Sequence, residues 1–324
     1  MSTEPTLQPG DRLDQYRLDD RIAASGMATV FRATDTLTGT QVAIKVPHAG
    51  IEDDPTAYER FKRETEIGAR LDHPGVMKVY PAPSQSQPYM VMEWVNGRLL
   101  RSILNEQGKL PAQRAVKLTL GISRALEYIH ANGIVHRDLK PENIMVDAQD
   151  NIRLIDFGIA ANAGARRLTY ANFSKGMGTP DYISPEQVEG KRGDARSDVY
   201  SLGVMLYEML TGKLPFSGPN PLAVMNARLI SHPEPPMAVE PSITPQLQEI
   251  LYRALERDPR NRYSVREFVY DLEHQDQVGI PLRPEAANWR RYRPAGAGRI
   301  LLYAALALAP ILIFALLLLT AHHH

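Results

Sequence analysis

Residues 136–143 read His-Arg-Asp-Leu-Lys-Pro-Glu-Asn (HRDLKPEN), and the triplet Asp156-Phe157-Gly158 follows after a short predicted hairpin. Upstream, Val42-Ala43-Ile44-Lys45 lies on a β-type run, and downstream the chain carries Ser184-Pro185-Glu186. Each motif alone is a weak signal, because short matches arise by chance. All four in this order and at these spacings are not expected by chance, so they indicate a single catalytic constellation.

Composition excludes several other classes of protein. The 324 residues contain 37 Lys and Arg against 37 Asp and Glu, so no global positive field attracts nucleic acid. The absence of cysteine excludes a disulfide framework, an iron–sulfur site and thiol catalysis. We therefore expect no nucleic-acid partner.

The N-terminal part of the chain is dominated by short β-type runs. These runs occupy residues 16–22, 29–35, 41–46, 76–80 and 89–95, and residues 56–71 have helical periodicity. They predict a five-stranded, mostly antiparallel sheet with one helix.

After Gly97 the pattern becomes helical. Pro111 opens a predicted helix that runs through Ala131, and a loop-rich stretch covers 135–186. Further helical segments are expected near 198–211, 221–230, 245–256 and 264–275. The predicted fold class is α+β, with a small sheet lobe, a larger helical lobe and a cleft near Glu93 to Gly97.

On these residues the chain resembles the protein kinase superfamily, specifically the serine/threonine kinases of eukaryotic type found in bacteria. The resemblance covers roughly Tyr16 to His274 and includes Asp198. It also includes Arg262, which is the usual ion-pair partner of the Glu186 position. It implies the bilobal protein kinase fold. The implied domain spans 13–276, with a small lobe at about 13–95 and a large lobe at about 98–276, after a flexible start at 1–12.

The resemblance assigns catalytic roles to four residues near the two central motifs. Asp138 would accept or orient the proton of the substrate hydroxyl, and Lys140 would reach the γ-phosphate of ATP. Asn143 and Asp156 would supply the oxygen ligands that Mg²⁺ prefers, with Mn²⁺ as an alternative. Phosphoryl transfer needs such groups, because its catalysis is mainly positioning and stabilisation of charge. Lys140 also favours Ser/Thr substrates over Tyr.

The same resemblance places the nucleotide. Lys45 would hold the α- and β-phosphates and Glu64 would orient it, while Met92 would stand behind the adenine and the backbone of Glu93 and Val95 would bond the base. The remaining residues of the implied nucleotide site are Ile22, Ala23, Ala24, Ser25, Gly26, Met27, Ala28, Thr29, Val30, Ala43 and Met145.

The loop that covers the phosphates departs from the family pattern. Where the family has G-x-G-x-x-G, this chain has Ala23, Ser25 and Ala28, and Gly26 follows the second position. A methyl group restricts positive φ and close approach of the backbone to phosphate. We expect weaker or slower nucleotide handling, which the Ser25 hydroxyl could offset as a donor.

Other interpretations accompany the leading one. Taken singly, Lys45 could be a surface cation, Asp156 a turn residue and Asn143 a helix cap. Taken together, the intact set favours an active kinase over a membrane-tethered pseudokinase that serves as a nucleotide-binding scaffold. A small-molecule kinase is the third possibility, but such enzymes seldom keep a peptide platform such as GTPDYISPE at 178–186.

The C-terminal sequence predicts a membrane anchor. Residues 300–321 carry no charge, and about 22 residues at 1.5 Å each cross a ~30 Å hydrocarbon layer. The basic linker 277–299 precedes them, and a short His tail at 322–324 follows. A buried core helix is the alternative interpretation. We expect a single-pass, tail-anchored protein of the cell inner membrane with its kinase domain in the cytoplasm.

The implied activation segment contains two candidate regulatory sites. Thr169 and Ser174 are its hydroxyl candidates for autophosphorylation, and Arg137 could pair with an added phosphate. Thr179 is expected to be structural. The expected partners are protein substrates, the lipid membrane and a second copy of the chain, because a homodimer would permit autophosphorylation in trans.

Overall fold

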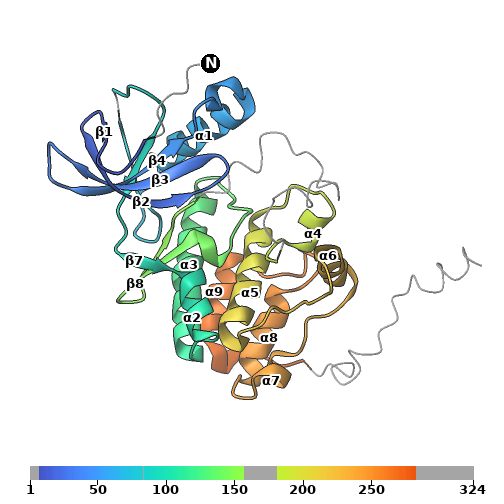
Figure 1. Cartoon of the computed structure of the whole chain (residues 1–324). Coiled ribbons are helices and arrows are strands. Elements are labelled where there is room, and N and C mark those ends of the chain that lie inside the picture. The colour runs from blue at the N-terminus through green and yellow to red at the C-terminus, as the bar shows by residue number, and fades with distance from the viewer. Residues whose placement is uncertain (1–6, 83, 157–180, 282–324) are drawn as a thin grey trace, which may run out of the picture. The chain divides into compact units, whose positions relative to one another are not determined.

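Six antiparallel strands form the sheet of the small lobe, in the order β1-β2-β3-β4-β6-β5 (Figure 1). The strands are β1 (Arg12–Leu13), β2 (Tyr16–Ala24), β3 (Ala28–Asp35), β4 (Gln41–Pro47), β5 (Val79–Tyr80) and β6 (Met90–Glu93). The computed structural model describes residues 7–82, 84–156 and 181–281, and those up to Ile280 belong to one compact unit.

The sheet has one strand more than the sequence predicted. Arg12 and Leu13 pair with Arg17 and Tyr16 of β2, and a two-residue strand has no alternation for a pattern to reveal. The run predicted at 76–80 also divides: Val76 forms an isolated parallel bridge with Leu154 of the other lobe, and only its last two residues join the sheet. The prediction of five strands was therefore wrong.

Among the described residues of the small lobe, the α-helix α1 (Pro55–Gly68) begins at a well-formed cap. The Asp54 side chain accepts hydrogen bonds from the backbone amides of Thr56 and Ala57. Glu64 is the charged member of the buried side of α1, which also contains Phe61 and Gly68. The helical phase therefore directs a carboxylate inward, against the sheet.

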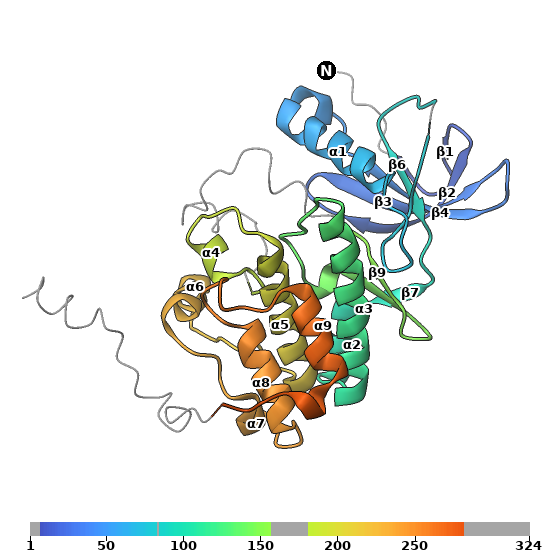
Figure 2. The ribbon, with the colours of Figure 1, turned by 180° about the vertical axis from the view of Figure 1, so that it is seen from behind.

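The large lobe is mainly helical, with a small second sheet of order β7-β8-β9 (Figure 2). Its elements are β7 (Gly97–Leu99), α2 (Leu100–Gln107), α3 (Ala112–Ala131), β8 (Ile144–Asp147), β9 (Ile152–Leu154), α4 (Pro185–Val188), α5 (Ala195–Thr211), α6 (Pro221–Ile230), α7 (Pro236–Val239), α8 (Pro245–Ala254) and α9 (Val265–Glu273). Single 3₁₀ turns lie at 51–53, 141–143 and 275–277. The predicted helices are present, whereas α2, α4 and α7 were not predicted.

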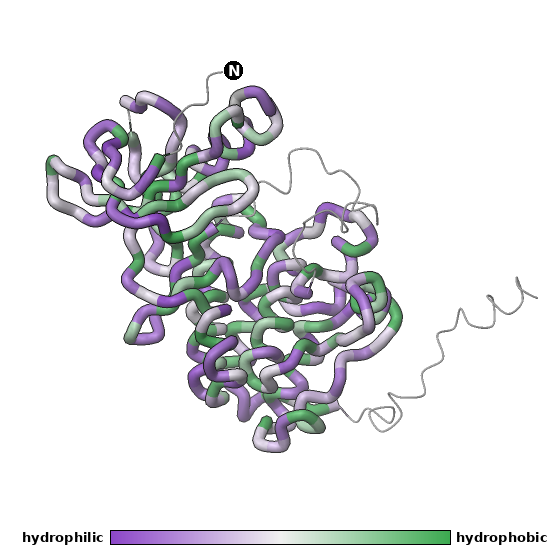
Figure 3. Tube along the Cα trace, in the orientation of Figure 1, coloured by the Kyte–Doolittle hydropathy of each residue, from purple (hydrophilic) through white to green (hydrophobic). Residues whose placement is uncertain are grey.

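The core of the large lobe is built around α5. Every residue of α5 from Ser197 to Thr211 is buried, and α3, α8 and α9 contribute to the same apolar cluster. In Figure 3 green apolar stretches run along these helices and along the strands of the small lobe. This core fixes the loops at the upper ends of α3 and α5, which carry the site described below.

Within the described ranges, no helix has the length and apolar character needed to cross a membrane. The predicted span at 300–321 and its linker from 282 onward lie outside the described residues.

Candidate active site

Lys45 and Glu64 form an ion pair between the sheet and the helix of the small lobe. Lys45 lies in β4 opposite Val30 and Met90, and its Nζ is 2.7 Å from Glu64 Oε1. The two side chains are 22% and 10% exposed, so the pair is shielded from solvent. Its geometry is that expected for a lysine oriented by a carboxylate.

Asp156 completes a three-membered charge cluster with this pair. Burial works against the charged form of Lys45, but Asp156 and Glu64 outweigh it and raise the pKa of the lysine. Burial raises the pKa of Glu64 to about 7, with Asp156 adding to the effect and Lys45 opposing it. Lys45 is therefore held positive, while Glu64 titrates close to neutrality.

Residues 136–143, the predicted catalytic loop, bring Asp138, Lys140 and Asn143 together. Lys140 Nζ lies 2.7 Å from Asp138 Oδ2, and Asn143 Nδ2 donates to the Asp138 carbonyl at 2.8 Å. Asp138 remains 45% exposed, so a substrate hydroxyl can reach its carboxylate. Asn143 uses its amide nitrogen in the loop, which leaves its Oδ1 atom to act as a ligand.

A main-chain hydrogen bond links Asn143 to Ile155, the residue before the other predicted metal ligand, Asp156. Asp156 follows β9, and the amide of Ile155 donates to the Asn143 carbonyl at 3.0 Å. The residues that carry the two oxygen donors are thus joined through adjacent backbone. A carboxylate and an amide oxygen are donors of the kind that Mg²⁺ prefers.

Asp198, at the start of α5, holds the backbone of the catalytic loop. Its Oδ2 accepts from the His136 amide at 2.9 Å and its Oδ1 from the Arg137 amide at 2.7 Å. His130 Nε2 lies 2.7 Å from Oδ2. Arg137 has a φ of 64°, which a non-glycine residue adopts only when its surroundings impose it. Asp198 supplies that constraint.

The turn between β2 and β3 is closed by Ser25. Its hydroxyl donates to the Ala28 carbonyl at 3.1 Å and accepts from the amides of Met27 at 3.3 Å and Ala28 at 3.1 Å. The hydroxyl expected to act as a phosphate donor thus bonds the turn itself. Gly26 has no positive φ, and a Cβ there would meet nothing within 4 Å.

The predicted adenine site lies where the small sheet meets the second sheet. Ala43 and Met92 are paired across β4 and β6 and belong to one apolar cluster, against which Val30 packs. The Glu93 amide donates to the Lys78 carbonyl at 2.8 Å. Ile22 and Met27 are 51% and 48% exposed on the turn, and Ala23 and Ala24 at the end of β2 are exposed as well. Thr29, Val95 and Met145 are half-buried.

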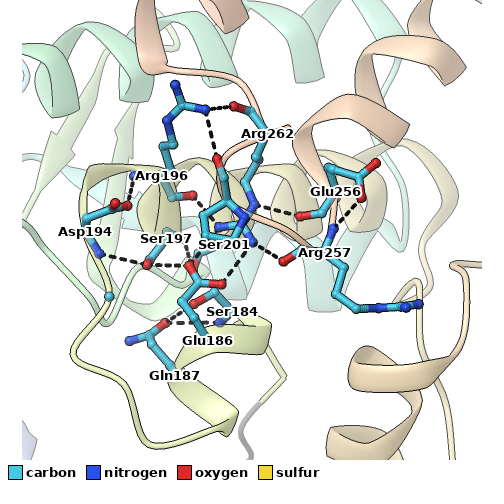
Figure 4. Close-up of polar contacts among 12 residues, drawn as sticks. Ser184, Glu186, Gln187, Asp194, Arg196, Ser197, Ser201, Glu256, Arg257 and Arg262 are labelled. Atoms are coloured by element: carbon cyan, nitrogen blue, oxygen red, sulfur yellow. Dashed lines mark hydrogen bonds and ion pairs between the residues drawn. The ribbon is translucent and has the colours of Figure 1, made fainter. Parts of the chain in front are cut away.

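A buried ion pair anchors Glu186, the last residue of the predicted peptide platform 178–186. Arg262 donates to both carboxylate oxygens of Glu186, at 2.8 and 2.9 Å, and is 1% exposed (Figure 4). Ser197 Oγ donates to the same carboxylate at 2.6 Å. Burial opposes the charge of Glu186, but the Arg262 hydrogen bonds outweigh it and lower the pKa of the carboxyl. The pair joins the two residues that the resemblance identified as ion-pair partners.

Two groups of residues complete the comparison with the sequence. Phe157, Gly158, Thr169, Ser174 and Thr179 lie outside the described residues. Sequence reasoning also missed Arg101, Tyr182 and Glu208, which interact beside the catalytic loop. The charge of Glu208 within the apolar run of α5 was the available signal, because a buried acid requires a partner.

A small antiparallel sheet above a helical lobe, with a lysine–glutamate pair and two oxygen donors on adjoining loops, is the arrangement of a phosphotransferase. The model of the protein kinase domain matches residues 16–272. A probable serine/threonine-protein kinase of Streptomyces coelicolor is 42% identical over 265 residues, which cover 80% of this chain and 39% of that protein. The serine/threonine-protein kinase PknB of Mycobacterium leprae is 40% identical, over 81% of this chain and 42% of its own length.

A solved structure agrees with these relatives. The kinase domain of Mycobacterium tuberculosis PknI, solved as a point mutant, superposes with a TM-score of 0.64 at 26% identity, covering 84% of this chain and 100% of that one. The chain belongs to the protein kinase family. It spans about two fifths of the length of the curated relatives named above. The predictions of a bilobal kinase fold and of a protein kinase domain are confirmed.

Proposed function

We propose that the protein transfers the γ-phosphate of ATP to serine or threonine hydroxyls of protein substrates. The observation that carries this proposal is the Lys45–Glu64 ion pair at 2.7 Å, with Asp156 close enough to share a hydrogen bond with Glu64. A scaffold that only recruits partners has no need for a shielded cation at this point. The alternative, a pseudokinase, keeps the fold but transfers no phosphate.

The residues divide the reaction between them. The substrate hydroxyl oxygen forms a bond to the γ-phosphorus as the bond from that phosphorus to the β–γ bridging oxygen breaks, and ADP leaves. Asp138 accepts the hydroxyl proton, and Lys140, 2.7 Å from it, balances charge on the transferred group. Lys45 holds the α- and β-phosphates. Asn143 and Asp156 would hold Mg²⁺, or Mn²⁺ in its place, which when bound neutralises phosphate charge.

Mass spectrometry after incubation with Mg·ATP and a generic protein acceptor tests the proposal. Wild-type protein should add phosphate to Ser and Thr, whereas Lys45→Met and Asp138→Asn should add almost none. Lys78→Met is the matched control, because its ammonium is 52% exposed and pairs only loosely with Asp72 at 3.5 Å. Wild-type protein that is as inert as Asp138→Asn while still binding Mg·ATP would establish the scaffold instead.

We also propose regulation by autophosphorylation at Thr169 or Ser174. The side chain of Arg137, next to the catalytic aspartate, donates to the Gly193 carbonyl at 3.3 Å and offers a cation to an added phosphate. Phosphopeptide mapping decides the matter, since phosphate found only outside 159–178 rejects this switch.

The uncharged run 300–321, behind a basic linker, supports a further proposal of a single membrane span with the kinase domain in the cytoplasm. Full-length protein should resist carbonate extraction from membranes, and residues 1–290 should not. In liposomes, trans-autophosphorylation should be faster with the tail than without it, because confinement raises the effective concentration of a second copy.

A further inference from the structure

A second cluster of charged side chains lies beside the catalytic loop, around Arg101 of α2. Arg101 Nε donates to Glu142 Oε1 at 2.9 Å, and Nη1 donates to Glu208 Oε1 at 2.7 Å. Nη2 donates to the Tyr182 hydroxyl, which itself donates to Glu208 Oε2 at 2.5 Å. One guanidinium therefore joins α2, the 3₁₀ turn 141–143, the segment at Tyr182 and α5.

Burial strengthens the contact between Arg101 and Glu208, whereas the Glu142 side chain is 44% exposed. The Glu208 side chain is 11% exposed and that of Arg101 is 24% exposed, so both charges depend on each other for compensation. The guanidinium also lies 5.8 Å from the centre of the Tyr182 ring. Ser201 Oγ donates to the Tyr182 carbonyl at 2.7 Å, which fixes the main chain of the platform at the same residue.

The cluster connects to the catalytic aspartate. Glu142 lies in the 3₁₀ turn 141–143, and its neighbour Asn143 donates to the Asp138 carbonyl. A continuous set of hydrogen bonds and one turn of backbone thus runs from Tyr182, two residues before Ser184, to Asp138. This path connects the predicted peptide platform with Asp138, the proposed acceptor of the hydroxyl proton.

We propose that Arg101 is a positioning residue that places the peptide substrate relative to Asp138, an inference that rests on the proposed kinase function. Arginine suits this role because its planar fork bonds several acceptors at fixed angles, which a lysine ammonium cannot do. Small displacements of a reacting group lower rates steeply, so loss of the fork should be visible in transfer to peptide. The nucleotide residues are outside the cluster and should be unaffected.

The experiment compares Arg101→Met, Arg101→Lys and Glu142→Gln with Arg98→Met. Arg98 is the matched control, because its pair with Glu106 is more than half exposed. Peptide phosphorylation, ATP hydrolysis without peptide and thermal unfolding are measured for each. Arg101→Met and Glu142→Gln should each lower kcat/KM for peptide by about tenfold. Arg101→Lys should restore only part of the kcat/KM for peptide. Its KM for ATP and its rate of ATP hydrolysis without peptide should stay within about twofold of wild type.

Two results would overturn the proposal. If Glu142→Gln transfers phosphate normally and Arg101→Met changes only the melting temperature, Arg101 is a structural residue. If Arg101→Met gains rate selectively on arginine-containing peptides, the freed carboxylates are a substrate subsite. Wild-type protein without any transfer would instead refute the proposed function, so the two failures are distinguishable.

Discussion

Replacing Asp198 with asparagine tests how the catalytic loop is held. The change keeps size and shape but removes the anionic acceptor of two backbone amides, those of His136 and Arg137. Hydrogen bonds to charged groups contribute about 1.5–3 kcal/mol each, and a neutral amide oxygen can retain one of the two at reduced strength. The left-handed backbone of Arg137 adds about 1–2 kcal/mol of strain that these bonds now offset.

We therefore expect Asp198→Asn to lower the free energy of unfolding by about 3 kcal/mol, a large part of the roughly 5–15 kcal/mol typical of a domain. With a urea m-value of about 3 kcal/mol/M, the midpoint should fall by about 1 M. Urea titration followed by circular dichroism measures this. Peptide kcat should also fall, by about tenfold or more, because Asp138 follows the displaced residues.

Asp194→Asn is the matched control on the same helix. Asp194 caps α5 by accepting from the Arg196 amide at 2.8 Å, and asparagine is an equally good cap. Its free energy of unfolding should stay within about 0.5 kcal/mol of wild type. Equal midpoints for Asp198→Asn and wild type would refute the reasoning, since the loop would then hold its conformation without the charge.

Three further outcomes are expected. The pKa of Glu64 is raised from 4.5 to about 7, so between these pH values the folded state binds more protons than the unfolded state. The free energy of unfolding should therefore fall as pH rises through this window, while kcat/KM for ATP increases. Glu64→Gln should remove both pH dependences, which urea titrations and initial rates would measure. A Cβ at Gly97 would lie 2.5 Å from the Val146 carbonyl oxygen, so Gly97→Ala should cost about 1–3 kcal/mol and raise KM for ATP, as calorimetry and kinetics would show. Gly26→Ala should leave the melting temperature unchanged, because its Cβ meets nothing, and any loss should appear only in KM for ATP.

Sequence patterns predicted the strands and helices whose conformation depends on residues that are close together in the chain. The β-type runs located β3 and β4, and the family resemblance together with a predicted helix pointed to Glu64 as the partner of Lys45. The two-residue strand at Arg12 could not be found, because its pairing depends on a tertiary neighbour. Helix α2 could have been found, since Leu100, Ile103 and Leu104 have helical spacing on a buried face.

The sequence could not predict which hydrogen bonds individual side chains make. Nothing in the order of residues indicates that the Ser25 hydroxyl bonds its own turn at Ala28. The contacts of Arg101 likewise join segments up to 107 positions apart, and only the packed fold determines which segments meet. Motif spacing identified the residues of the site, whereas the hydrogen bonds that hold them depend on the tertiary structure.

The bond between the Ile155 amide and the Asn143 carbonyl has a consequence for altering cation preference. Because the main chain fixes the spacing of residues 143 and 155, a side-chain exchange at either proposed ligand would alter the charge of the site while the backbone spacing stays the same. An Asn143→Asp variant would offer a second anionic ligand, but it would also lose the amide that donates to the Asp138 carbonyl, so cation preference at this position is coupled to the support of the catalytic loop.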